Sequence, residues 1–203
     1  MKSRVASPAF WASLVALAGI TVAMLLYRGG NPLNEGISYH FTENFLSDLG
    51  ITSTYNHTSQ PLVITFFAIG LFAASVATWS WYRSAEKATR SLAILAACFL
   101  ILVPLIPSDL FFWPHRIVVL AALISLALAN IRFLTRGGIQ GHSYQLALSI
   151  FQVAYLIFVF IGPMPAEARV LHVILQKIAI YSQLALYICC NAPLGNKKTT
   201  EVR

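Results

Sequence analysis

The chain of 203 residues is 58% hydrophobic and only 10% charged, and its mean hydropathy is +0.71. A soluble domain could not bury this much apolar surface, so the composition excludes a water-soluble enzyme or binding domain and predicts an all-α, polytopic membrane protein. The formal net charge of +7 comes from basic residues scattered over short loops and tails. Such scattering is weak evidence for nucleic acid, and no nucleic-acid partner is expected.

Six apolar segments are long enough to cross a bilayer, whose hydrocarbon core of roughly 30 Å needs about 20 residues of helix. They lack the alternating pattern of a membrane barrel, and helices satisfy their own backbone hydrogen bonds in lipid. The expected transmembrane helices cover about 9–27, 61–82, 90–106, 116–133, 144–162 and 169–190. They form a single domain, 1–194, followed by a polar cytoplasmic tail, 195–203. Only the connection 28–60 is long enough to fold over the bundle as a lid.

Basic residues gather on one side of these helices. Ten of the 14 lysines and arginines would lie there, and they are Lys2, Arg4, Arg83, Lys87, Arg90, Arg132, Arg136, Lys197, Lys198 and Arg203. Because basic residues favour the cytoplasmic side, both termini are predicted to be cytoplasmic and the loop 28–60 to lie outside. The expected location is the cell membrane, with the chain crossing it several times.

The loop contains one segment with the pattern of a short amphipathic helix. Thr42 is a suitable N-cap and Gly50 a suitable stop, so 42–49 is predicted to form two helical turns. Apolar residues recur there at every fourth position: Phe41, Phe45 and Leu49. Asp48 would lie in the last turn, where the helix dipole disfavours an anion, so a nearby cation is expected. The alternative is a lid that only seals the bundle, with Asp48 bonded to backbone.

The last helix carries a polar stripe through most of the bilayer: Arg169, His172, Gln176 and Gln183. Such residues turn toward other helices or a polar cavity. Lys177 lies off this stripe, roughly 12 Å along the axis from Arg169. A lysine at that depth costs about 3 kcal/mol, so a carboxylate partner or a polar cavity is expected. The alternative is a lysine that reaches the outer interface.

Two further polar groups stand out. Asp109, His115 and Arg116 in the turn between the third and fourth helices are expected to meet Asp48, Arg169 and His172 at one outer mouth. The alternative is a capped turn with Arg116 bound to lipid phosphate. In the fifth helix one face carries Gln145, Ser149 and Gln152, which is expected to pair with Gln183 by interhelical hydrogen bonds.

The segment from Asn44 to Gly50 resembles an N-x-x-S-D-L-G-like motif of uncharacterised bacterial and archaeal six-helix membrane proteins, where it also follows the first helix. These are distantly similar to the FRAG/DRAM/Sfk group, which is associated with lipids and lipid remodelling. The resemblance points to Asn44, Ser47, Asp48 and Gly50, and it implies no established reaction.

The leading hypothesis is an outward-facing polar site that binds a lipid headgroup in lipid sensing or remodelling, because basic pockets between helices hold anionic headgroups. The expected partners are membrane lipids, no cofactor is expected, and the oligomeric state is left open. The expected ligand-binding residues are Glu43, Asn44, Asp48, Asp109, Arg116, Arg169, His172, Gln176 and Lys177.

Two alternatives remain, so whether the protein is an enzyme is left open. A membrane-embedded hydrolase could use Ser47 as a nucleophile, or bind a divalent metal that activates water through Asp48, Asp109, His115 and His172. This second form is similar to the ceramidase-like superfamily, but Gln176 stands where its paired H-x-x-x-H would place a second histidine. A proton-coupled transporter built around Lys177 is the third possibility, although no inverted repeat is visible.

Overall fold

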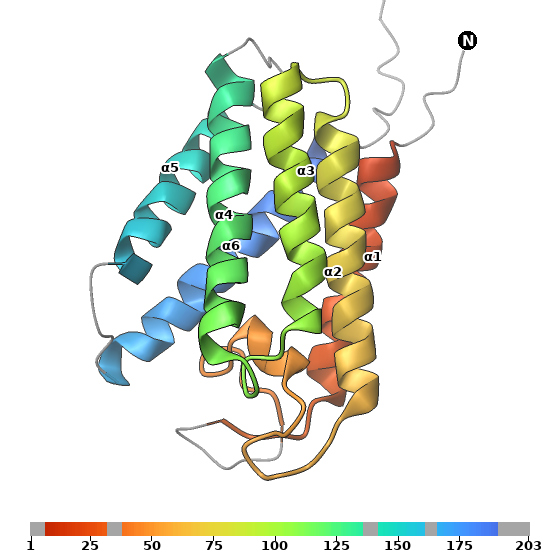
Figure 1. Ribbon diagram of the computed structural model, residues 1–203, viewed down its shortest axis with the longest axis vertical. Helices are drawn as coiled ribbons and strands as arrows, with labels where there is room; N and C mark the ends of the chain where they lie inside the picture. Colours follow the sequence, from red (N-terminus) through yellow and green to blue (C-terminus); the bar gives the residue numbers. More distant parts are fainter. Residues whose placement is uncertain (1–6, 32–37, 136–141, 161–165, 191–203) are drawn as a thin grey trace, which may run out of the picture.

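A computed structural model describes residues 7–31, 38–135, 142–160 and 166–190, and this part of the chain is a helical bundle (Figure 1). Its α-helices are α1 (Pro8–Leu26), α2 (Pro61–Tyr82), α3 (Lys87–Leu102), α4 (Phe112–Thr135), α5 (His142–Phe160) and α6 (Ala166–Cys189). Two short 3-10 helices, η1 (Leu46–Gly50) and η2 (Val103–Leu105), lie in the connections. The loop between α1 and α2 folds under the lower end of the bundle in Figure 1, which we call the loop end.

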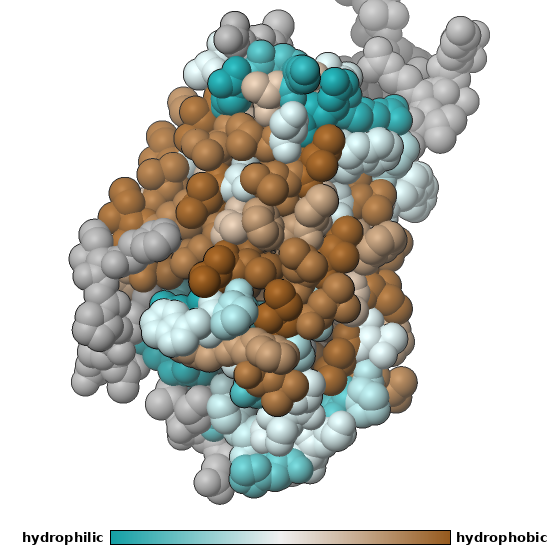
Figure 2. Space-filling model, viewed as in Figure 1, coloured by the Kyte–Doolittle hydropathy of each residue, from teal (hydrophilic) through white to brown (hydrophobic). Residues whose placement is uncertain are grey.

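The protein is a polytopic α-helical membrane protein. Among the described residues five helices are long and apolar enough to cross a membrane, namely α1, α2, α3 with η2, α4 and α6. The apolar part of α5, Ser143–Val159, is shorter. Figure 2 shows a broad hydrophobic band between two more hydrophilic ends, as a bilayer requires.

The helix boundaries follow local chemistry. α1 and α2 begin at prolines, whose missing N–H would have no partner in a first turn, and Ser7 Oγ accepts a hydrogen bond from the Phe10 N–H (3.3 Å). The predicted start of the fourth helix at 116 is wrong, since α4 already begins at Phe112. His115 and Arg116 therefore belong to the first turns of α4 and not to the connection before it. α3 likewise begins at Lys87, three residues before the predicted start at 90.

The packing of the helices leaves a space inside the bundle. α1 and α2 pack most closely, because a Cβ on Gly19 would lie 2.9 Å from the backbone nitrogen of Gly70. α6 crosses the bundle obliquely in Figure 1 and packs mainly against α1 and α5. α4 packs against α3 and α5. The region between α2, α3, α4 and α6 is consequently less tightly filled.

A buried network of amide side chains joins α2, α4, α5 and α6 in the half of the bundle away from the loop. Asn130 is fully buried and donates to Gln152 Oε1 (3.0 Å) and Gln183 Oε1 (2.8 Å). Its own carbonyl accepts from Gln145 Nε2 (3.1 Å) and from the Tyr82 hydroxyl. Gln152 Nε2 donates to Gln183 Oε1 (3.1 Å), which confirms the expected pairing of the fifth and last helices. We call these five residues the amide network.

Candidate ligand site at the loop end

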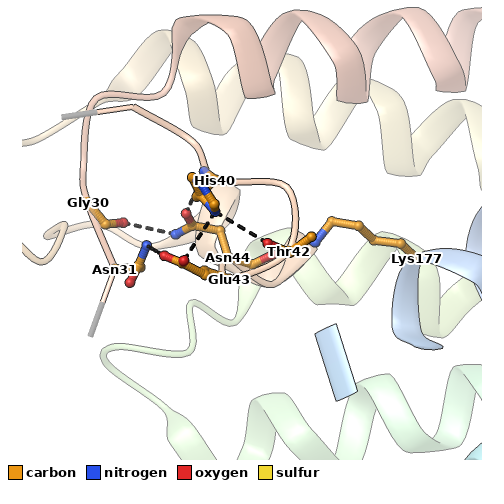
Figure 3. A network of polar contacts seen from close by, with 7 residues as sticks. All are labelled: Gly30, Asn31, His40, Thr42, Glu43, Asn44 and Lys177. Carbon is orange, nitrogen blue, oxygen red and sulfur yellow. Dashed lines mark hydrogen bonds and ion pairs between the residues drawn. The ribbon is translucent and has the colours of Figure 1, made fainter. Parts of the chain in front are cut away.

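Asn44 organises the loop from its centre (Figure 3). Its side chain is fully buried, donates to the Gly30 carbonyl (2.9 Å), and accepts from the His40 N–H (2.9 Å). Its backbone carbonyl accepts from the Tyr39 hydroxyl (3.1 Å). A short side chain that bonds backbone groups in this way competes with regular helix, so the chain turns tightly around it.

The predicted α-helix over 42–49 is wrong. The chain forms only the 3-10 helix η1, with Phe45 and not Thr42 as its N-cap. Asp48 lies at the third helical position and accepts from the Phe45 N–H (2.9 Å) through Oδ2. The carboxylate therefore caps the start of the helix, where the backbone dipole favours an anion, instead of opposing the dipole at its end.

Asp48 is 4% exposed and lies among hydrogen-bond donors and cations. Its carboxylate also accepts from Asn44 Nδ2 (3.2 Å) and the Tyr55 hydroxyl (3.4 Å). Burial raises the pKa of Asp48, and the Asn44 bond and the charges of Arg169 and Lys177 offset this only in part. The expected cation partners are thus close, although neither lies within the 4.0 Å of an ion pair.

Lys177 of α6 fixes the loop to the bundle. It is 1% exposed, and its ammonium donates to the Asn44 carbonyl. It also lies 5.3 Å from the centre of the Tyr39 ring and 4.9 Å from that of Phe41. Phe41 itself is 52% exposed while Leu49 is fully buried, so the expected apolar stripe of the loop does not form. The lysine is solvated by a carbonyl and two aromatic faces.

Besides Lys177, which lies off the polar stripe of α6, two residues of that stripe contact the loop. Gln176 Oε1 accepts from the Leu46 N–H (3.0 Å), the first residue of η1. The His172 ring packs edge-on against Phe45, with centroids 4.8 Å apart, and its Nε2 lies 2.9 Å from the Tyr155 hydroxyl of α5. The polar stripe of α6 therefore turns inward as predicted, and one turn of the loop covers it.

Arg169, nearest the loop end of the stripe, is incompletely bonded. Its guanidinium lies 4.8 Å from the centre of the Phe45 ring, and its charge acts on Asp48 and Tyr55. Burial and the charge of Asp48 raise the pKa of Tyr55 to about 12, so this hydroxyl keeps its proton at neutral pH. The Nε and Nη2 atoms of Arg169 are buried and have no hydrogen-bond partner among the described residues. Arginine stays charged in proteins, so the site holds a cation with two vacant donors.

The turn before α4 takes a different role from the predicted one. Asp109 accepts from the N–H groups of Thr52 (3.0 Å) and Ser53 (2.9 Å), which ties the loop to this turn. Burial tends to raise the pKa of Asp109, but the hydrogen bond from the Thr52 hydroxyl (2.6 Å) and the two backbone bonds outweigh it and lower the pKa overall. The buried His115 Nδ1 lies 2.6 Å from the Ile106 carbonyl. Both side chains thus bond groups at the turn and not Asp48, and the buried Nε2 of His115 has no hydrogen-bond partner among the described residues.

Arg116 does lie toward the predicted mouth. Its guanidinium is 5.4 Å from the ring centre of Phe112 and 5.5 Å from that of Trp113, and its charge acts on His172. An arginine on aromatic rings at a helix end is typical of the membrane–water interface. The charges of Arg116 and Arg169 both act on His172, and we call these two arginines the basic pair.

Glu43 and Ser47 lie outside this basic pair. Glu43 accepts from Asn31 Nδ2 (3.0 Å) and lies 3.3 Å from His40 Nδ1, so it braces the loop (Figure 3). Ser47 is half-buried and lines a cavity below the loop. None of the hydrogen bonds found in the described ranges connects Ser47 with a histidine, so the nucleophile hypothesis gains no support from its surroundings. Gly50 is required by close contact, because a Cβ there would lie 2.9 Å from the Phe67 ring.

The four residues considered for a metal are not brought together. Asp48 caps η1, Asp109 bonds Thr52 and Ser53, His115 bonds a carbonyl, and His172 contacts Tyr155. Within the described ranges no three His, Cys, Asp or Glu side chains are placed to hold a metal ion. The residues that do come together are the basic pair, His172 and the loop.

Sequence reasoning missed the tyrosines around the site. Tyr27, Tyr39 and Tyr55 each direct a hydroxyl to a loop carbonyl or to Asp48. A tyrosine in a loop has no periodicity that would reveal its partner. The only available signal was the presence of three tyrosines so close to the motif.

Comparison with known proteins adds no relative: no family model matches the chain, and no curated protein or solved structure matches it significantly. The resemblance of the motif stays a prediction, and the function must be argued from the site.

Proposed function

We propose that this membrane protein binds an anionic lipid headgroup at the loop end, with Arg169 as the main contact and Arg116 as the second. The observation that carries the proposal is that two buried nitrogens of the Arg169 guanidinium, Nε and Nη2, donate to no group among the described residues. A buried donor without a partner costs about 1–3 kcal/mol, and more when it is charged. An anion that accepts from Nε and Nη2 would remove this penalty.

The chemistry of the site favours a phosphate or carboxylate group. The guanidinium presents its donors in a planar fork that matches two oxygens of such a group. The cluster contains two basic side chains, the half-buried Arg169 and the buried Lys177, and one carboxyl, the buried Asp48. This leaves the cluster short of negative charge whether or not Asp48 is ionised.

A headgroup is favoured over a free anion by the position of the site. Arg169 stands in the first turn of α6, and Arg116 stands in the first turns of α4, at the same end of a membrane-spanning bundle. Lipid phosphates lie at this depth. Gln176 and Lys177 hold the loop on the same helix as Arg169, so a bound headgroup would change the contacts of the loop. Such a coupling suits a role in lipid sensing or remodelling.

The test is native mass spectrometry of the protein in a non-phospholipid detergent, with phosphatidylglycerol added. Arg169→Gln should reduce the phosphatidylglycerol adduct about tenfold, which corresponds to about 1.4 kcal/mol for one lost charge-assisted contact. The control is Arg90→Gln, which removes an exposed arginine from α3 at the opposite end. Equal retention by Arg169→Gln and Arg90→Gln would overturn the proposal.

A further inference from the structure

An apolar cavity lies inside the bundle, between the loop and the amide network. Its walls come from η1, α2, α3, α4 and α6, with side chains such as Leu71, Leu126 and Leu184. It exists because α6 packs against α1 and α5, and because alanines such as Ala122 and Ala179 line it. The empty space is about 800 Å³ including that at its opening. The lining residues of α6 run from Gln176 to Tyr187, about 17 Å at 1.5 Å per residue, so the cavity extends along the helix and suits a slender chain.

The two ends of the cavity differ from its walls. At the loop end it is closed by Leu46, Ser47 and Gln176. At the other end Thr78, Gln183 and Tyr187 supply polar groups, next to the amide network. The Tyr187 hydroxyl donates to Thr78 Oγ1 (3.3 Å) and Gln183 Oε1 accepts from Asn130 (2.8 Å), so this end is a closed polar layer that an apolar chain gains nothing by entering.

The cavity lines up with the basic pair. Arg169, Gln176 and Gln183 succeed each other at intervals of seven residues on one face of α6, so the path from Arg169 to Gln183 is about 21 Å. Half of a hydrocarbon core of roughly 30 Å is about 15 Å, the depth that one lipid chain fills in one leaflet. A chain attached to a headgroup at Arg169 would thus reach well into the cavity. The segment Phe45–Ser47 lies between the two and would have to shift to admit it.

We infer that the cavity binds one hydrocarbon chain of the anionic lipid whose headgroup Arg169 holds. This deepens the proposed function, on which its headgroup half rests, and it assigns a ligand class: a phospholipid with a single chain, or one chain of a two-chain phospholipid. The apolar walls supply the affinity for the chain, and the polar end sets the length that fits.

The first experiment locates the chain directly. The full-length protein in detergent is photolysed with lysophosphatidylglycerol that carries a diazirine at the end of its acyl chain, and labelled peptides are sequenced. Label is expected on Leu126 of α4 or Leu184 of α6, which line the cavity and are 6% and 2% exposed. Ile124 and Leu128 of α4 are exposed on the outside of the bundle. Label confined to these two residues would overturn the inference.

The second experiment narrows the cavity. Ala122→Leu fills it from α4, whereas Ala121→Leu adds the same atoms to the neighbouring residue, which does not line it. Overpacking typically costs 1–3 kcal/mol, so Ala122→Leu should weaken the lysophosphatidylglycerol adduct about tenfold, and Ala121→Leu should leave it unchanged. Size-exclusion profiles confirm that both variants are folded. Should Ala122→Leu not fold, Ala179→Leu narrows the same cavity from α6.

The two proposals fail in different ways. If Arg169→Gln abolishes the adduct while Ala122→Leu and Ala179→Leu retain it, the headgroup site stands and the chain site is overturned. If the cavity variants lose the adduct while Arg169→Gln keeps it, the chain site stands and the headgroup assignment is overturned. Monoacylglycerol, which has the chain without the anion, should respond to Ala122→Leu and not to Arg169→Gln.

Discussion

The bundle contains two buried polar clusters, one at the loop end and one in the amide network, and they differ in whether their unbonded atoms carry a charge. The network consists of neutral side chains whose donors and acceptors pair with one another across four helices. In the described chain two of its side-chain atoms, Gln145 Oε1 and Gln183 Nε2, lack a hydrogen bond. The loop end instead buries a permanently charged guanidinium with two vacant donors.

This difference separates a structural role from a binding role. A network of neutral side chains that bond mainly one another stabilises the packing of helices and presents no charge to a ligand. A buried cation that lacks an acceptor is costly unless something supplies one. Substitutions in the amide network should therefore lower the free energy of unfolding and leave lipid binding unchanged. Substitution of Arg169 should weaken lipid binding and leave the free energy of unfolding unchanged.

The largest expected effect is on the network. Asn130→Leu keeps the approximate volume but removes the centre of four hydrogen bonds, which in membrane proteins contribute about 0.6 kcal/mol each. The free energy of unfolding should fall by roughly 2–3 kcal/mol, measured by denaturation in mixed micelles. Ser149→Ala is the control, because among the described residues this buried hydroxyl bonds the carbonyl of Gln145 in its own helix (2.8 Å) and no group of another helix. Equal free energies of unfolding for the two variants would show that the network does not stabilise the bundle.

A smaller, local effect is expected where α6 holds the loop. Gln176→Leu leaves the buried N–H of Leu46 without its acceptor, which should raise the free energy of the closed loop by about 1–2 kcal/mol. Hydrogen exchange of the loop amides should accelerate about tenfold, while α1 and α2 exchange as before. Gln60→Leu removes the same kind of bond, to the N–H of Arg28 (2.9 Å), at an exposed position. Similar exchange in both variants would show that Gln176 does not anchor the loop.

Five of the six described α-helices could be predicted as spans from the sequence because their apolar runs are long enough to cross a bilayer, whereas the apolar part of α5 is shorter. The inward turn of the polar stripe on α6 also followed from the cost of exposing Arg169 and Gln176 to lipid. The pairing of Gln152 with Gln183 followed from the same reasoning. In each case the signal lies in the spacing of residues along one helix.

The loop could not be predicted in the same way. A helix over 42–49 fitted the spacing of apolar residues, but Asn44 and Asp48 bond the backbone and prevent it. Lys177 was expected to find a carboxylate or a polar cavity, and it instead finds the carbonyl of Asn44. The position of a loop carbonyl depends on the path of the whole loop, which no local pattern encodes.

The smallest expected effect is on the exposed contact between the loop and the turn before α4. Asp109 has a lowered pKa and accepts from the N–H groups of Thr52 and Ser53, so its contribution to stability is present above the unfolded pKa of about 3.9. This contribution is lost as the pH falls through the lowered pKa of Asp109 in the folded protein. The buried Asp48 acts in the opposite direction, because its raised pKa makes the stability fall as the pH rises above about 3.9.

Asp109→Ala should therefore lower the free energy of unfolding at pH 6 by only about 0.5 kcal/mol, because solvent screens an exposed carboxylate. The difference from wild type should vanish as the pH falls below the folded pKa of Asp109. Chemical denaturation of both proteins across this range measures it. A difference that persisted at the lowest pH would mean that the side chain acts by packing and not by its charge, and the loop would then be held mainly from α6.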